Sequence, residues 1–249
     1  MGQRPRRAAD TIHAVAVVFL EHSTMRMEQP SRHQCLIYDG APSRHLPMLA
    51  RVMRQKLNQG YRCMFLDSAP MVVGMRSYLA AAGVDVIADV ASGRLIMSSE
   101  RNYLIGGRRF DVDRMLGAIA DAVQSALGGG FEGLWASGNI GWELGPERDF
   151  SQLLEYEWQL DGFIRENPGL QGICQYHRDT LPAEAVTDGL LSHASLVVDE
   201  ARSLINPHLC AREAFRKDSR DNPNFEPFVQ GLCRMMPEVP EAMLVAAGD

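Results

Sequence analysis

Lysine is scarce in this chain. Only two of the 25 basic residues are lysines, Lys56 and Lys217, among 249 residues in total. A phosphate-binding P-loop needs a lysine and a Ser or Thr after a glycine-rich turn, because backbone amides cradle the phosphates while the lysine offsets their charge. Lys56 lies in Arg-Gln-Lys-Leu and Lys217 in Arg-Lys-Asp, so neither has that context. We therefore expect no conventional ATP hydrolysis by this chain alone.

Paired cysteines and long apolar runs are also missing. The five cysteines lie far apart without a Cys-x-x-Cys pair, which predicts reduced thiols and a cytoplasmic location. The apolar stretch 12–20 is shorter than the roughly 20 residues that cross a bilayer. Glu21 and His22 follow it in place of a small-residue cleavage site. We interpret the stretch as a packed or dimer-forming helix, or a strand, in an N-terminal basic and apolar extension over 1–30, and we expect no membrane partner.

Charge is distributed unevenly. Residues 1–62 hold ten Arg and Lys against four Asp and Glu, a local charge of +6, which leaves −12 for the remainder. The asymmetry would suit an acidic partner. The basic residues form no run with interleaved aromatics, however, so a solvated surface is the better interpretation. We expect no direct binding of nucleic acid.

Short apolar runs alternate with segments of helical periodicity. The predicted strands are 35–38, 63–66, 84–87, 95–97, 134–136, 170–176 and 195–198, and the predicted helices cover about 46–57, 71–79, 111–126, 150–166 and a segment begun by Pro182. Strands separated by helices imply right-handed crossovers. We predict an α/β fold with a mostly parallel, twisted sheet and helices on both faces, over residues 31–205. Residues 206–249, with several prolines, predict an appended and partly irregular tail.

Several short motifs occur together in a recognisable order. They are His33-Gln-Cys-Leu-Ile-Tyr38, Tyr103 with Gly107 and Phe110-Asp111, Gly133 to Gly138 with Trp142, Leu154-Glu155-Tyr156-Glu157, and Cys174-Gln-Tyr176 with His193. This set resembles the MEDS domain, the sensory domain named for methanogens, methylotrophs and the dichloromethane regulator. The resemblance covers roughly residues 30–205. It implies a RecA/KaiC-like core that has lost its P-loop and senses small molecules for histidine kinases and transcription regulators.

The chain departs from the family pattern near the expected pocket. Relatives usually read Leu-Arg and then Gly-Asp/Glu-Met-x-Trp, whereas Trp135 and Asn139 replace the cation and the anion here. Ala194 follows His193 where relatives have proline. The expected pocket is therefore less charged than in relatives, which favours an organic compound over an anion.

The candidate ligand-binding residues combine the family motifs with the predicted topology. They are His33, Cys35, Tyr38, Arg44, Tyr103, Asn139, Trp142, Glu155, Cys174, Tyr176 and His193. Ligands of parallel α/β sheets bind at the carboxyl ends of the strands. We therefore predict a pocket for an unknown small organic ligand between loop 39–45 and segment 137–142. No catalytic residue, cofactor or metal ligand is assigned, and the aromatic candidates suit either a pocket wall or ordinary core packing.

Cysteine and histidine give a second interpretation. His33 and Cys35 share one side of a strand, and Cys174 and Tyr176 share one side of another. With His177 they could supply ligands for zinc or a redox-responsive thiol. The spacing matches no recognised zinc knuckle, and small buried cysteines explain the same pattern.

Two glutamates flank Tyr156 on a predicted helix. Glu155 and Glu157 point about 200° apart, so they cannot act as a pair on one face. Two interpretations stay open: Glu155 accepts hydrogen bonds from the region of Arg101 or Tyr103 while Glu157 is solvated, or these glutamates form structural ion pairs in place of a ligand contact.

Three functions remain open from the sequence. The first is a non-enzymatic small-molecule sensory module that regulates a kinase or the transcription machinery. No kinase or helix-turn-helix module is recognisable, so its output would pass through a signalling partner or a homo-oligomer. The alternatives are an atypical nucleotide-binding or phosphotransfer enzyme that uses Arg44, and a thiol- or metal-dependent sensor that uses Cys35 and Cys174.

Overall fold

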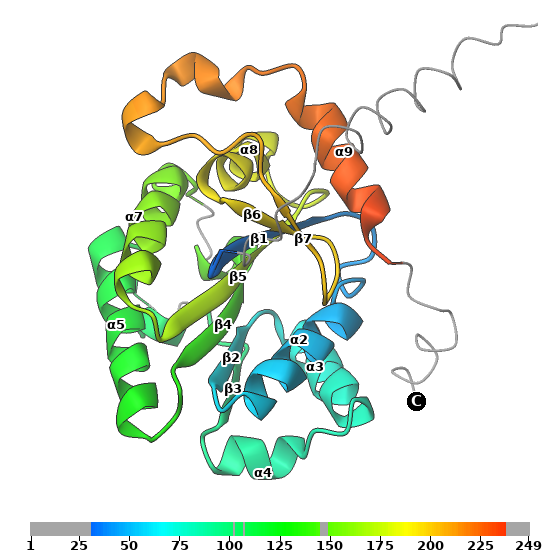
Figure 1. Cartoon of the computed structure of the whole chain (residues 1–249), viewed down its shortest axis with the longest axis vertical. Coiled ribbons are helices and arrows are strands. Elements are labelled where there is room, and N and C mark those ends of the chain that lie inside the picture. The colour runs from blue at the N-terminus through cyan, green and yellow to red at the C-terminus, as the bar shows by residue number, and fades with distance from the viewer. Residues whose placement is uncertain (1–30, 102, 107, 145–148, 238–249) are drawn as a thin grey trace, which may run out of the picture. The chain divides into compact units, whose positions relative to one another are not determined.

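Seven strands form one sheet in the part of the chain that the structure describes. The computed structural model describes residues 31–101, 103–106, 108–144 and 149–237 (Figure 1). The strands are β1 (His33–Tyr38), β2 (Arg62–Leu66), β3 (Leu95–Ser98), β4 (Leu134–Asn139), β5 (Leu170–His177), β6 (Ser195–Val197) and β7 (Ser203–Ile205). Their order is β3-β2-β4-β5-β1-β6-β7, and only the β6–β7 pair is antiparallel. The predicted mostly parallel α/β sheet is confirmed.

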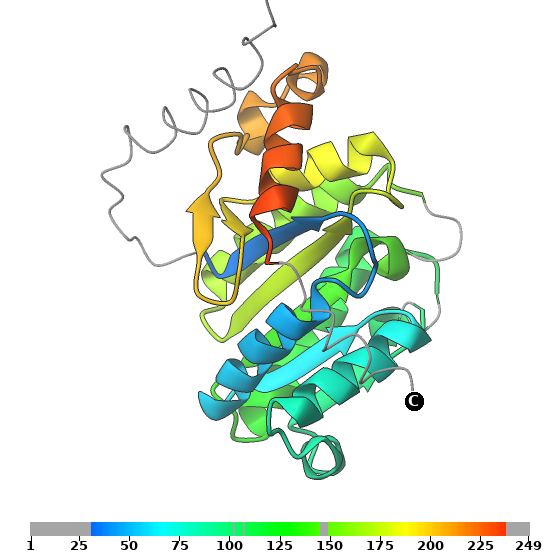
Figure 2. The ribbon, with the colours of Figure 1, turned by 90° about the vertical axis from the view of Figure 1, so that its right-hand side faces the viewer.

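Helices cover both faces of this sheet, as predicted. The helices are α2 (Leu46–Asn58), α3 (Ala69–Ala81), α4 (Val86–Ala91), α5 (Val112–Gly128), α6 (Ile140–Glu143), α7 (Leu153–Glu166), α8 (Ala183–Ser192) and α9 (Phe225–Met235), with the 3-10 turns η1 (Tyr103–Ile105), η2 (Arg212–Ala214) and η3 (Lys217–Arg220). One core lies between the sheet and α5, α7 and α8, and the other lies between the sheet and α2 and α3 (Figures 1 and 2). None of the helices in the described ranges combines the length and apolar character needed to cross a bilayer.

Local sequence signals explain where α5 and β4 begin. The Asp111 side chain accepts a hydrogen bond from the backbone amide of Arg114 at 3.0 Å and caps α5, as the sequence suggested. Gly133 then allows the starts of β4 and β5 to approach closely. A Cβ atom there would lie 2.0 Å from the carbonyl oxygen of Gly169. Any larger residue would force these two central strands apart.

The predicted strand over 84–87 is wrong. Asp85 caps α4 instead, because its side chain accepts a hydrogen bond from the amide of Ala88 at 3.0 Å. Ile87 is 85% exposed, whereas Val84 and Val86 are partly buried against the core. The run was too short for periodicity to separate a strand from one helical turn.

Two elements near the C-terminus were not predicted as such. β7 adds an antiparallel edge strand at residues 203–205, within the span expected for the main domain. In the expected tail, α9 packs against β1 (Figure 2), and its Phe225, Val229 and Leu232 join the core beside α5, α7 and α8. The predicted extension over 1–30, with its apolar stretch, lies outside the described residues.

Candidate functional site

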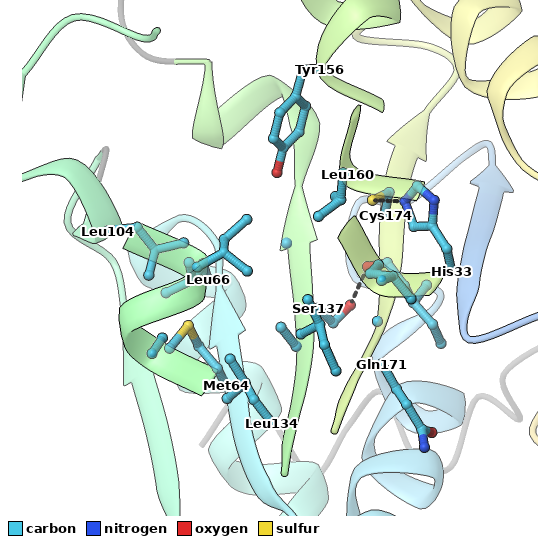
Figure 3. A pocket seen from close by; sticks show the side chains of 18 residues that line it. His33, Met64, Leu66, Leu104, Leu134, Ser137, Tyr156, Leu160, Gln171 and Cys174 are labelled. Carbon is cyan, nitrogen blue, oxygen red and sulfur yellow. Dashed lines mark hydrogen bonds between the residues drawn. The ribbon is translucent and has the colours of Figure 1, made fainter. Parts of the chain in front are cut away.

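A small cavity lies between the sheet and the helices α5 and α7 (Figure 3). Its volume is about 60 Å³. Its walls are mostly apolar side chains from β2, β4, α5 and α7, among them Met64, Leu66, Leu134, Ile119, Leu160 and Ile164. His33 and Cys174 bring polar atoms to one wall, and Tyr156 of α7 lines another. The cavity therefore suits a small and weakly polar molecule.

The position of this cavity differs from the predicted pocket. We expected a pocket between loop 39–45 and segment 137–142, and only Ser137 and Gly138 of these segments line the cavity. The cavity lies on the α5 and α7 face of the sheet, whereas the loop leads into α2 on the other face. Successive side chains of a strand point to opposite faces of the sheet, so residues close in sequence can line different faces.

Four polar side chains meet beside the cavity, and we call them the buried cluster. They are His33, Glu157, Cys174 and His193. Glu157 Oε2 lies 3.2 Å from His33 Nε2, 3.6 Å from Cys174 Sγ and 3.6 Å from His193 Nε2. The dashed line in Figure 3 joins Cys174 Sγ to His33 Nε2, at 3.5 Å. All four ligand-type atoms lie within 4.8 Å of one another.

Four separate elements bring the buried cluster together. β1 and β5 are neighbours in register, with Cys35 opposite Cys174, so His33 and Cys174 project from the same face. α7 supplies Glu157 from above that face. His193 follows the last residue of α8, and its Nδ1 lies 2.8 Å from the carbonyl oxygen of Gly189. The cluster therefore joins the centre of the sheet to α7 and α8.

Electrostatics favour an ion pair between His33 and Glu157 and keep His193 neutral. Burial opposes ionisation of Glu157, yet His193 and His33 hold its pKa below the usual value, and the Tyr176 hydroxyl adds a hydrogen bond to Oε1 at 2.5 Å. Burial also opposes the charged form of His33, but Asp161 and Glu157 raise its pKa overall. Burial and the nearby charge of His33 lower the pKa of His193 to about 4. Ionised Glu157 therefore lies beside His33, whose charged form it favours, and beside neutral His193.

Cys35 and Tyr176 surround the cluster. Both are fully buried, on the same face of the sheet as His33 and Cys174. This confirms that Cys35 shares a side of its strand with His33, and that Tyr176 shares one with Cys174. Burial raises the pKa of the Cys35 thiol well above its usual value, and Glu157 adds to this effect. Cys35 is therefore a protonated core residue beside the cluster, and Tyr176 holds the outer oxygen of Glu157.

His177 does not join the cysteines, so that part of the zinc interpretation is wrong. Its ring stacks on Tyr38 on the α2 face, with a centroid distance of 4.9 Å. Its Nδ1 lies 3.0 Å from the Thr180 hydroxyl and its Nε2 lies 3.0 Å from the carbonyl oxygen of Gly40. Residues three apart on a strand face opposite sides, which separates His177 from Cys174.

Tyr38, Arg44 and Asn139 lie near the carboxyl ends of the strands. Tyr38 is buried on the α2 face against His45, at a centroid distance of 4.2 Å. Arg44 pairs with Asp39 at 2.7 Å and also donates to backbone carbonyls at the end of α9. Asn139 Nδ2 lies 3.5 Å from a carboxylate oxygen of Asp67. These candidates lie apart from the cavity and the buried cluster.

The remaining candidates lie at or beyond the edge of the site. Tyr103 is 39% exposed, and the neighbouring Leu104 lines the cavity in its place. Glu155 pairs with Arg212 at 2.6 Å and accepts from Gln159 at 2.6 Å, so of the two interpretations the structural ion pair is confirmed. The side chain of Trp142 lies outside the described part of the structure.

Glu157 was misplaced by the sequence analysis, although a signal was present. It was expected to be solvated, but its side chain is fully buried. Leu153, Glu157, Leu160 and Ile164 recur at helical spacing and form the buried stripe of α7. A carboxylate within an apolar stripe is costly unless it is paired, so its position marks a polar site.

All four cluster residues fall within one family match. The sequence pattern of the MEDS family, described as the methanogen/methylotroph, DcmR sensory domain, matches residues 32–194. The chain belongs to the MEDS family. Comparison with curated proteins gives no match for it. The family assignment supports a sensory or signalling role, and the cavity and the buried cluster are this MEDS chain's candidate site.

Proposed function

We propose that this MEDS-family chain is a non-enzymatic sensory module that binds a small organic molecule in the cavity and regulates a kinase or the transcription machinery. The observation that carries the proposal is the apolar cavity of about 60 Å³ inside a family of sensory domains. Its polar wall at His33 and Cys174 links it directly to the buried cluster. A ligand bound in the cavity would therefore affect the packing of β1, β5, α7 and α8, which meet at the cluster.

The size of the cavity limits the ligand. A cavity of about 150 Å³ holds benzene in a protein core, and this one is less than half that volume. The ligand class that fits is a compound of one to a few carbon atoms without formal charge. A formal charge would lack a partner along the apolar walls and would be costly to bury.

We also propose that the sheet is a RecA/KaiC-like core without its P-loop, in a cytoplasmic protein. Loop 39–45 lies between β1 and α2, where a P-loop would lie, and contains one glycine and no lysine. Arg44, the cation in this loop, is engaged with Asp39 and the end of α9. These contacts favour the sensory function over nucleotide chemistry.

A cavity-filling variant tests the proposal. Ala122 of α5 lines the cavity, so Ala122→Leu places three extra carbon atoms in it. We expect dichloromethane, or another neutral compound of one to three carbons, to raise the melting temperature of the wild-type protein and not that of the variant. Calorimetry in sealed cells, with each compound titrated, makes the measurement.

The matched control is Ala118→Leu. Ala118 lies on the same helix and packs against the same core, but does not line the cavity. It should keep the response to the ligand. If no compound of the panel shifts the wild-type protein, or if the Ala122→Leu protein responds equally, the cavity is not the sensory site.

A further inference from the structure

The buried cluster contains a contact that hydrogen bonding leaves unexplained. His193 Nδ1 lies against the carbonyl oxygen of Gly189 at 2.8 Å, and a carbonyl only accepts, so this nitrogen carries the proton. The lone pair of Nε2 then points toward Glu157 Oε2 at 3.6 Å. His193 Nε2 is buried and has no hydrogen-bond partner. A lone pair facing a carboxylate in a buried site is an arrangement that a bound cation would complete.

We propose that His33, Glu157, Cys174 and His193 bind one zinc ion. A tetrahedral zinc ion with bonds of about 2.0–2.3 Å places its ligand atoms about 3.3–3.7 Å apart. The four separations between ligand atoms given above run from 3.2 to 3.6 Å. Two imidazoles, one carboxylate and one thiolate are all donors that zinc accepts.

The surroundings hold three of the ligands in binding orientation. His193 donates its other ring nitrogen to Gly189, which leaves Nε2 free for a metal. His33 Nδ1 lies 3.5 Å from Asp161 Oδ1, the arrangement of a carboxylate behind a metal-bound histidine. Tyr176 donates to Glu157 Oε1 and leaves Oε2 directed inward. Outer partners of this kind fix the tautomer and orientation of metal ligands.

Charge and access also suit a zinc ion. The Cys174 thiolate and the Glu157 carboxylate together supply two negative charges, which balance the ion in a buried place. Cys174 must lose its thiol proton and His33 the proton on Nε2 when the metal binds, and both protons pass to solvent. Both His33 and Cys174 line the cavity, and Cys174 is only partly buried. The proposal does not rest on the sensory function, because zinc binding can be measured without any organic ligand.

The test is zinc content in the untagged full-length chain, with zinc as the probe. The protein is stripped with a chelator, reloaded with zinc and measured by elemental analysis and native mass spectrometry. We expect one zinc ion per wild-type chain, and affinity weakened at least 100-fold in Cys174→Ser and His193→Gln. Asp161→Asn, which changes only the support of His33, should weaken zinc binding by about 10- to 100-fold. Cys63→Ser is the matched control, because Cys63 is a buried cysteine on the opposite face, and it should keep the ion.

Cobalt substitution keeps the proposal testable even if a variant fails to fold. Cobalt(II) in the wild-type chain should give the intense visible bands of a tetrahedral ion and a charge-transfer band from thiolate to cobalt. Absence of that charge-transfer band, or a wild-type chain without stoichiometric zinc, would overturn the proposal. Folded Cys174→Ser and His193→Gln proteins that retain zinc at wild-type affinity would overturn it as well.

Discussion

Single buried groups set much of the chemistry of this molecule, and Asp67 shows how. This carboxyl group follows β2 and is 2% exposed. Its Oδ1 accepts from the backbone amide of Ser68 at 2.6 Å, and Asn139 offers only a long contact to Oδ2. Burial raises the pKa of Asp67 from 3.8 to about 6, because two acceptor contacts do not offset the loss of water. The ionised form therefore destabilises the fold near neutral pH.

We predict that Asp67→Asn becomes increasingly favourable as pH rises. Between about pH 4 and pH 6 the folded protein keeps the Asp67 proton and the unfolded chain loses it, so this group's contribution to stability falls as pH rises. The difference corresponds to about 3 kcal/mol, at 1.36 kcal/mol per pH unit. Urea unfolding of both proteins at pH 4 and pH 7 measures this. Between these pH values the free energy of unfolding of the variant, relative to that of the wild type, should rise by up to that amount. A difference that is the same at both pH values would contradict the assignment.

At the scale of residues, strand periodicity predicted more than motif spacing did. Because residues two apart on a strand share a face, the sequence correctly placed His33 on the same face as Cys35 and Cys174 on the same face as Tyr176. The same rule separates His177 from Cys174, which the zinc interpretation overlooked. Glu157 required knowledge of which helical face is buried. That depends on packing against the sheet, and the choice between two flanking glutamates cannot be made from local sequence alone.

Among the helices, two glycines differ in what they permit. Gly189 lies in α8 under the ring of Tyr176, and a Cβ atom there would lie 2.6 Å from two ring carbons. Gly117 lies in α5, where an added Cβ meets nothing within 4 Å. The absence of a side chain therefore lets α8 pack against the residue that holds Glu157.

We predict opposite effects for Gly189→Ala and Gly117→Ala. Gly189→Ala should destabilise the fold by about 1–3 kcal/mol, because the Tyr176 ring must move. Gly117→Ala should stabilise it by about 0.5–1 kcal/mol, because alanine favours a helix. Urea unfolding measures both. Equal stability of the two variants would show that the Tyr176 ring moves without cost and does not constrain α8.

Element types were predictable where caps or long periodic stripes were present, as for α5 and α7. The short run 84–87 failed because a cap at Asp85 outweighed apolar composition. β7 and α9 escaped prediction for another reason. β7 has three residues and gains its partner only from β6, and the α9 stripe lies among prolines that indicate irregular structure.

At the scale of the whole molecule, crossover rules predicted a parallel sheet but not the strand order. β1 lies between β5 and β6, so segments more than 130 residues apart form the centre of the sheet. That order places two polar groupings on opposite faces of the same strands, the buried cluster under α7 and α8 and the Tyr38–His177 stack under α2. Sequence spacing alone merged them into one expected pocket.

The last prediction concerns Arg44, which connects the two ends of the described chain. Its guanidinium pairs with Asp39 after β1 and donates to the carbonyl oxygens of Cys233 and Met236, each at 3.3 Å, at the end of α9. Hydrogen bonds from a charged group are worth about 1.5–3 kcal/mol. Arg44→Ala should therefore speed hydrogen exchange in α9 by about 10- to 100-fold. Exchange in β4 and β5 should not change.

Arg51→Ala is the control, because Arg51 lies on α2 and pairs with Glu200 at the surface. Exposed ion pairs contribute little to stability, so hydrogen exchange in α9 of this variant should match the wild type.

The same two variants also test the alternative that the chain binds a nucleotide. If Arg44 serves a nucleotide, Arg44→Ala would abolish magnesium-dependent ATP binding or turnover and leave α9 exchange unchanged. If Arg44 is structural, Arg44→Ala should speed exchange in α9 and should not affect ATP binding. The loop in the P-loop position would then anchor α9 to the sheet and would not bind a phosphate.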